Sequence, residues 1–172
     1  FPARIAEVAM WLIDHQMNLL VSFEFGQYFS RLPLKKSANI TNGNALQIDW
    51  ETIVPKNELS YILGNPPFVG SKMMTVEQRN DVLKEANNIK GSGVLDYVTA
   101  WYFKASKFIQ GTKIKAAFVS TNSITQGEQV SIIWSELLNN YNIKIHFAHR
   151  TFKWSNEAKG NAAVYCVIIG FA

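Results

Sequence analysis

Two consecutive prolines, Pro66 and Pro67, closely follow the apolar run Leu59–Leu63, and they limit how this chain can fold more than any other feature. Proline lacks the backbone N–H that a strand donates to its neighbour, so a strand formed by the apolar run has to end before Pro66. The sequence therefore predicts a strand that stops abruptly and leads into a rigid loop, Asn65 to Phe68.

Strand-like and helix-like segments alternate along the rest of the chain. Helical patterns cover residues 2–23, 94–108, 130–138 and a segment that begins at Thr75, and strand patterns cover 59–63, 114–120, 143–147 and 164–171. A short strand and a loop are expected over 38–46. This order predicts an α/β fold with a mostly parallel sheet covered on both faces, and an antiparallel pair of the last two strands at one edge.

The composition is that of a single folded domain. The chain has 172 residues, of which 48% are hydrophobic, so it can bury a core and disorder is excluded. Only 17% are charged, against about 25% in a usual soluble domain, so part of the surface is expected to meet other domains. The one cysteine, Cys166, excludes a disulfide scaffold and suits a reducing compartment.

The apolar stretch from Ile5 to Phe23 could be mistaken for a membrane span. Charged residues such as Glu7 and Asp14 interrupt it, and a charge inside a bilayer costs several kcal/mol. We therefore expect a buried helix and no membrane partner. The chain opens inside this helical pattern at Phe1, without a start methionine, so we expect it to be part of a longer protein.

The loop after the first apolar strand carries groups that suit a planar amine. Asn65 offers a side-chain carbonyl, Pro66 fixes the loop while its own carbonyl stays free, and Phe68 offers a ring face. Stacking of one base on such a ring contributes about 1–3 kcal/mol. The carboxyl end of a strand is where open α/β sheets bind their ligands. For these residues taken alone, a proline-rich turn with a packed aromatic is an equal alternative.

The segment Ser60–Lys72 resembles the catalytic motif of S-adenosylmethionine-dependent DNA methyltransferases that act on the N6 amino group of adenine. The resemblance extends over the whole chain, and Phe1–Asn18 is most similar to large bacterial restriction-modification proteins with fused endonuclease and target-recognition parts. It implies an incomplete Rossmann-like class I methyltransferase sheet in the bacterial cytoplasm. Residues 1–172 would be the C-terminal portion of the catalytic domain, without the family's glycine-rich cofactor loop.

The resemblance also implies the roles of individual residues. The implied catalytic residues are Asn65, Pro66, Pro67 and Phe68, and the implied contacts of S-adenosylmethionine are Asn44, Ala45, Pro67 and Trp101. The implied base-binding residues are Phe68 and Phe152, and the implied contacts to double-stranded DNA are Arg150, Lys153 and Lys159. Since the cofactor site would be incomplete, the isolated chain is expected to be inactive. The other implied partners are further domains of the same parent chain.

Several other features have simpler interpretations. The glycines of Gly91–Gly93 follow a polar stretch instead of a strand, so we interpret them as the start of a helix and not as a cofactor cradle. Asp96 is expected in the first turn of a helix, where a carboxylate complements the helix dipole. His146 and His149 suit structural or DNA-facing roles better than a zinc site, and no metal is expected.

Alternatives to each functional assignment stay open at this point. Methyltransferases of the same fold that act on guanine N2 of ribosomal RNA, or on a protein glutamine, also carry N-P-P-[YF] motifs. A non-catalytic nucleic-acid-binding protein is a third possibility. Trp101 suits the core as well as a cofactor pocket, and the basic residues around Phe152 suit a solvated hairpin tip as well as a DNA contact.

Overall fold

The computed structural model describes residues 2–28, 38–154 and 164–172. The chain divides into two compact units, 1–48 and 49–172, and each is described by itself. The first unit contains the helix α1 (Pro2–Phe25), which ends at Gly26 as the sequence predicts, with a positive φ of 60°.

The strand expected over 38–46 is not present among the described residues of the first unit. These residues form turns instead, because Asn44 holds the chain locally. Its side-chain oxygen accepts the N–H of Leu46 at 3.0 Å, and its carbonyl accepts the N–H of Gln47 at 2.9 Å. Asn and Asp side chains commonly compete with strand pairing in this way.

The apolar residues of α1 lie largely on the surface, with Phe23 87% exposed and Leu20 61% exposed. Within the first unit, no other described element covers this face of the helix, so the burial that the sequence predicts is not provided by that unit. In the described ranges, no helix has the length and apolar character needed to cross a membrane.

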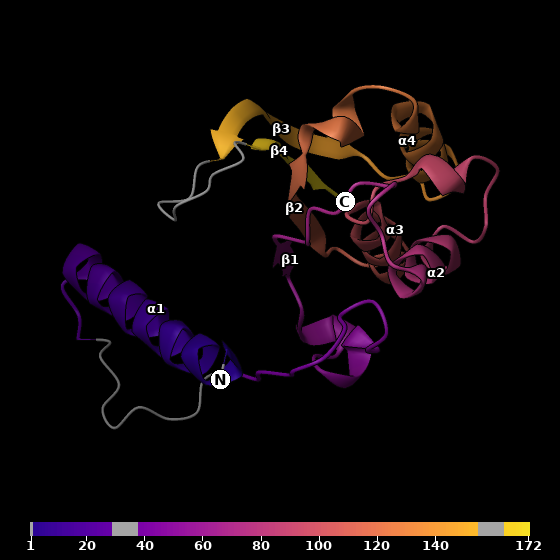
Figure 1. Ribbon diagram of the computed structural model, residues 1–172. Coiled ribbons are helices and arrows are strands. Elements are labelled where there is room, and N and C mark those ends of the chain that lie inside the picture. Colours follow the sequence, from indigo (N-terminus) through magenta and orange to yellow (C-terminus); the bar gives the residue numbers. More distant parts are fainter. Residues whose placement is uncertain (1, 29–37, 155–163) are drawn as a thin grey trace. The chain divides into compact units, whose positions relative to one another are not determined.

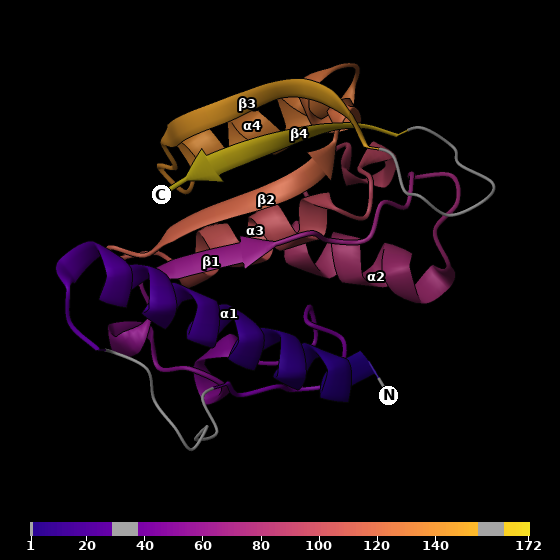
Figure 2. The same ribbon diagram turned by 90° about the vertical axis from the view of Figure 1, so that its left-hand side faces the viewer.

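The second unit is a four-stranded mixed sheet with helices on one face (Figures 1 and 2). Its elements are β1 (Tyr61–Gly64), α2 (Val76–Glu85), α3 (Thr99–Phe108), β2 (Lys115–Thr121), α4 (Gln129–Asn139), β3 (Ile145–Trp154) and β4 (Val164–Phe171). The strand order is β1-β2-β4-β3, with β1 and β2 parallel and β4 antiparallel to both of its neighbours. The last two strands form the predicted antiparallel pair. Because β4 returns between β2 and β3, the sheet has less parallel pairing than predicted.

The core lies between this sheet and the helices α2, α3 and α4, which Figure 2 shows behind the strands. The centroid of the Tyr102 ring in α3 lies 5.2 Å from that of Phe118 and 5.4 Å from that of Phe171. On the other face, Tyr61 and Leu63 of β1 are 64% and 76% exposed. Within this unit only one face of the sheet is covered, and not both as predicted, because its described helices all lie on the same side.

Two boundaries differ from those predicted, and one agrees. Thr75 and Gln78 form the capping box that begins α2, as the sequence predicts. The helix predicted from Val94 begins only at Thr99, after the short 3-10 helix η3 (Ser92–Val94). Strand β3 continues to Trp154, so the basic segment expected to be a connection belongs partly to a strand.

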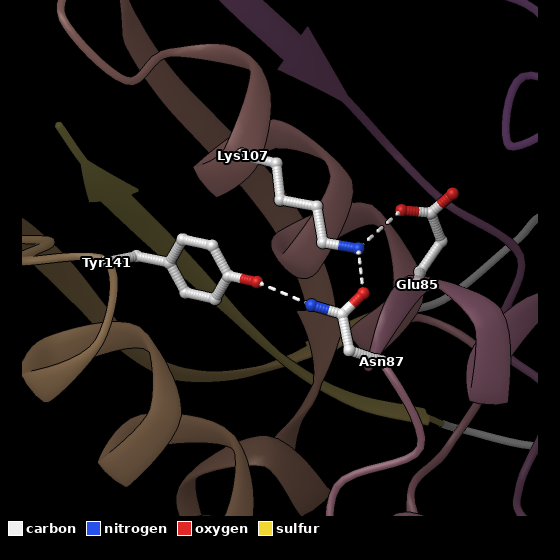
Figure 3. Close-up of polar contacts among 4 residues, drawn as sticks. All are labelled: Glu85, Asn87, Lys107 and Tyr141. Atoms are coloured by element: carbon white, nitrogen blue, oxygen red, sulfur yellow. Dashed lines mark hydrogen bonds and ion pairs between the residues drawn. The ribbon is translucent and has the colours of Figure 1, made fainter.

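A polar network joins the C-terminal ends of the three helices (Figure 3). The ammonium group of Lys107 lies 3.5 Å from the carboxylate of Glu85 and donates to the side-chain oxygen of Asn87 at 3.0 Å. The amide of Asn87 donates to the hydroxyl of Tyr141 at 3.1 Å. Since α3 leads from this network to the start of β2, the network lies at the end of the sheet where β2 begins.

Candidate active site

The loop at the end of β1 begins at a tightly packed glycine. Gly64 pairs with Phe118 of β2, and residues 65–70 have no regular secondary structure. Within the loop Pro66 is buried, Asn65 and Pro67 are exposed, and Phe68 is half-buried. The predicted end of the strand and the loop after it are therefore confirmed, and the amide and one ring are accessible.

Two hydrogen-bond acceptors of this loop are unused. The carbonyl of Pro67 accepts the N–H of Val69 at 3.2 Å. Among the described residues, no group donates to the side-chain oxygen of Asn65 or to the carbonyl of Pro66. Most polar groups in folded proteins have partners, so two unused acceptors on adjacent residues, one of them on the exposed Asn65, distinguish this loop.

The far end of the loop is fastened by backbone contacts. The N–H of Ser71 donates to Oδ1 of Asp96 at 2.7 Å, and the guanidinium of Arg79 donates to the carbonyl of the same serine. The N–H of Tyr97 donates to the carbonyl of Val69 at 2.9 Å. The loop is therefore held at both ends while its middle remains accessible.

Asp96 does not lie in the first turn of a helix, which corrects the prediction. It precedes α3, and its Oδ2 accepts hydrogen bonds from Ser123 at 2.6 Å and from the amide of Gln129 at 2.9 Å. These tertiary contacts keep it outside the helix and explain why α3 begins later than predicted. Sequence analysis missed this role because the partners are distant in the chain.

The glycines of Gly91–Gly93 form a tight turn that leads into η3. Gly91 has a φ of +88°, and a Cβ there would lie 2.8 Å from Cδ1 of Ile132 on α4. The positive φ favours glycine here, and a Cβ would in addition displace the end of the Ile132 side chain. The segment is therefore a packed turn at the start of a short helix, in line with the prediction.

The residues expected to contact the cofactor come from both units. Asn44 and Ala45 belong to the first unit, and Pro67 and Trp101 belong to the second. Trp101 is half-buried, with its ring 5.0 Å from that of Tyr97 in an edge-on contact. Tyr97 is buried and donates to Asp81 at 3.1 Å, so it belongs to the core. Trp101 keeps an accessible edge.

The basic residues predicted to contact DNA lie on β3, an edge strand of the described sheet. Arg150 and Lys153 are exposed, and neither pairs with a carboxylate in the described ranges. Lys159 lies outside the described residues. In those ranges no three His, Cys, Asp or Glu side chains gather as a metal site would require.

Phe152 lies at the same end of the sheet as the loop after β1, namely the end at which β1 and β2 finish. It is paired with Cys166 of β4, which is paired in turn with Thr121 at the carboxyl end of β2. The ring is half-buried, with its centroid 5.6 Å from that of His149 and 6.2 Å from that of Trp154. Phe152 of β3 and the loop that carries Phe68 therefore lie at one end of the sheet, with β2 and β4 between β1 and β3.

Two buried ionisable groups of the sheet and its core are uncharged at neutral pH. Burial raises the pKa of the Cys166 thiol, so it is a poor nucleophile at neutral pH. Burial also raises the pKa of Tyr102 well above its usual range, and its hydroxyl lies 2.7 Å from that of Ser120. Neither residue is therefore suited to act as a nucleophile at neutral pH.

Comparison with known proteins agrees with this architecture. Residues 1–172 match the family described as MmeI, DNA-methyltransferase domain. The chain is 42% identical over 174 residues to DNA methyltransferase A of Bacillus subtilis (strain 168), a match that covers 99% of this chain and 20% of that protein. A solved structure of the Type IIL restriction-modification enzyme MmeI in complex with DNA is 58% identical, with a TM-score of 0.86, and the match covers 99% of this chain and 23% of that one.

The chain therefore spans less than a quarter of the length of either relative. The match to the family nevertheless extends over every residue of the chain, and both relatives align along nearly all of it. The loop after β1, the anchored Asp96 and the basic edge strand all lie within the matched region. This chain belongs to the family of MmeI DNA-methyltransferase domains.

Proposed function

We propose that this chain is part of an enzyme that transfers a methyl group from S-adenosylmethionine to the N6 amino group of adenine in DNA, within a bacterial restriction-modification protein. The observation that carries this proposal is the pair of unused acceptors on adjacent residues, Asn65 and Pro66, in a loop held at both ends. An exocyclic amino group has two N–H donors and fits two such acceptors.

The proposed chemistry follows from the geometry of the amine. When the two N–H groups donate to the Asn65 side chain and the Pro66 carbonyl, the nitrogen lone pair is drawn out of conjugation with the ring and becomes nucleophilic. The methyl group that S-adenosylmethionine would supply could then pass to this nitrogen, leaving the cofactor as a neutral thioether, and the amine would release one proton to solvent. Hydrogen bonds that strengthen as the nitrogen becomes positively charged lower the barrier, since they favour the transition state over the ground state. No covalent enzyme intermediate is needed.

The residues of the second unit suit the adenosine end of the cofactor in their chemistry. Trp101 offers a partly accessible aromatic ring, and the exposed ring of Pro67 offers an apolar surface. Asn44 and Ala45 of the first unit are the other two proposed contacts, and the side-chain oxygen of Asn44 accepts the N–H of Leu46. S-adenosylmethionine, when bound, supplies a methyl group activated by a sulfonium that leaves as a neutral thioether.

The proposed substrate is an adenine extruded from double-stranded DNA. Phe68 and Phe152 would hold the base between them, while Arg150, Lys153 and Lys159 contact phosphates on either side. Phe68 and Phe152 are both half-buried, so each side chain is partly accessible. The relative MmeI has been solved in complex with DNA, which supports this assignment.

We further propose that residues 1–172 are the C-terminal portion of a catalytic domain within a longer protein of the bacterial cytoplasm. The isolated chain would then bind S-adenosylmethionine weakly and be inactive, because the glycine-rich loop would lie elsewhere in the protein. Titration calorimetry of residues 1–172 against S-adenosylmethionine checks this point. Binding in the micromolar range would contradict it and require a substitute site within these residues.

Methyl transfer by the full-length protein tests the proposed function. The protein is incubated with labelled S-adenosylmethionine and duplex DNA, and the DNA is digested to nucleosides. We expect the label in N6-methyl-2′-deoxyadenosine from the DNA, with none in methylated guanine of ribosomal RNA or in protein glutamine offered in parallel. Label in either of those other products would contradict the proposal, as would the absence of transfer to any of the three.

A further inference from the structure

Asp96 lies where separate segments of the second unit meet. Its Oδ1 accepts the N–H of Ser71 at 2.7 Å, and its Oδ2 accepts Oγ of Ser123 at 2.6 Å and Nε2 of Gln129 at 2.9 Å. These partners belong to the loop after β1, the turn after β2 and the first residue of α4. Building on the proposed function, we infer that Asp96 is the positioning residue that sets the loop Asn65–Phe68 for methyl transfer.

The polarity of this network is fixed by the partners. The side-chain oxygen of Gln129 accepts the backbone N–H of Asp96 at 3.1 Å, so the NH₂ of Gln129 has to face the carboxylate. Ser123 donates its only hydroxyl proton to Asp96, so the hydroxyl of Thr121, 2.7 Å away, donates to Ser123. Three donors therefore converge on the carboxylate of Asp96. If this residue were an asparagine, its NH₂ group would face the NH₂ group of Gln129.

The network acts on the loop through its far end. Ser71 lies three positions after Phe68, and its carbonyl accepts from Arg79 while its N–H is held by Asp96. The near end is fixed by the pairing of Gly64 in the sheet. Without the Asp96 contact, only Arg79 and the N–H of Tyr97 would hold the far end. A loosened loop would shift the acceptor atoms of Asn65, and a displacement of about 1 Å can lower a reaction rate about a hundredfold.

The test uses the full-length protein and single-turnover methyl transfer to an adenine-containing duplex with saturating cofactor. Asp96→Asn should lower the rate constant by about ten- to a hundredfold while the dissociation constants for DNA and S-adenosylmethionine change little. Gln129→Glu should also be slow, because it sets two carboxylates together. The double variant Asp96→Asn/Gln129→Glu should recover most of the rate, because the new amide can donate to the new carboxylate and to Ser123 while its oxygen still accepts from Ser71.

Glu85→Gln is the matched control, since it also converts a hydrogen-bonded carboxylate to an amide, but in the network at the opposite end of the sheet. It should leave the rate constant unchanged even if it lowers the melting temperature. Unchanged rates in Asp96→Asn and Gln129→Glu would overturn the inference, and so would a folded double variant as slow as Asp96→Asn. If Asp96→Asn does not fold, Ser123→Ala removes a single donor and should slow transfer several-fold, and an unchanged rate there would overturn the inference. A wild-type protein that methylates no adenine in DNA would instead refute the proposed function.

Discussion

Gly64 lies directly opposite Phe118 in the parallel pair of β1 and β2, and a Cβ on the glycine would lie 3.1 Å from the phenylalanine ring. The ring is 2% exposed and contacts Tyr102 and Phe171, so it has little room to move. The residue immediately before Asn65 is therefore fixed by the core of the unit. The start of the loop and the packing of the core are coupled through this one contact.

Gly64→Ala should destabilise the sheet by about 1–3 kcal/mol, the usual cost of adding a methyl group to a packed core. It should also slow methyl transfer, because the loop would begin from a displaced strand. Hydrogen exchange of the β1 and β2 peptides and the single-turnover rate measure the two effects. Gly93→Ala is the control, since a Cβ there meets nothing within 4 Å. Equal behaviour of the two variants would contradict the account.

Tyr102→Phe should change how the stability of the sheet depends on pH. Since burial raises the pKa of Tyr102 in the folded protein, the phenol stabilises the fold fully below its unfolded pKa of about 10, and this contribution is lost as the pH rises above that value. The variant should be less stable at pH 7 by about 1–2 kcal/mol, because Ser120 loses its partner. Above pH 10 the difference between the two proteins should shrink.

The stability of the sheet can be followed by the rate at which Cys166 is alkylated, measured at the peptide level. The thiol is fully buried, so it reacts only when β4 opens. The labelling rates of the two proteins are compared at the same pH, which cancels the ionisation of the thiol itself. Tyr165→Phe, at an exposed tyrosine one residue away, is the control. If the difference in labelling rate between the wild-type protein and Tyr102→Phe grew with pH, it would contradict the role given to Tyr102.

Arg150→Ala and Lys153→Ala should each weaken DNA binding by the full-length protein and reduce its dependence on salt. Each lost phosphate contact lowers the slope of log affinity against log salt concentration by about 1. Lys113→Ala makes the same change of charge just before the start of β2, at the opposite end of that strand, and should leave the slope unaltered. If all three variants behave alike, β3 does not contact the DNA backbone.

Phe152→Ala should weaken trapping of the extruded base by about 1–3 kcal/mol, the value of one base–aromatic contact. A fluorescent base analogue at the target position reports the extrusion. A mismatch opposite the target should partly restore it, because less energy is then needed to unpair the base. Phe152→Tyr keeps the ring face and should be tolerated. An unchanged signal in Phe152→Ala would show that this ring does not lie over the base.

Local patterns in the sequence predicted the elements whose ends are decided locally. The capping box of Thr75 and Gln78 begins α2, Gly26 ends α1, and Pro66 ends the first strand, as expected. Each of these depends on the chemistry of residues within a few positions of the boundary. The resemblance to adenine methyltransferases predicted the family, which the match over residues 1–172 confirms.

Features decided by distant contacts were not predicted. Asp96 stays outside α3 because its partners, Ser71, Ser123 and Gln129, are 25 or more positions away. The insertion of β4 between β2 and β3 likewise depends on pairing across the sheet, and it extends β3 as far as Trp154. Alternation in a single strand carries no information about which neighbour will pair with it.

The most direct test of the account is the rate of methyl transfer by the full-length protein carrying Asn65→Ala. The measurement is single-turnover transfer of labelled methyl to adenine N6 in duplex DNA, with the affinities for DNA and S-adenosylmethionine measured alongside. We expect the rate constant to fall by at least about a hundredfold, as on removal of a hydrogen bond made chiefly in the transition state, with both affinities nearly unchanged. A variant that transfers methyl groups at close to the normal rate would show that the loop after β1 is not the catalytic centre.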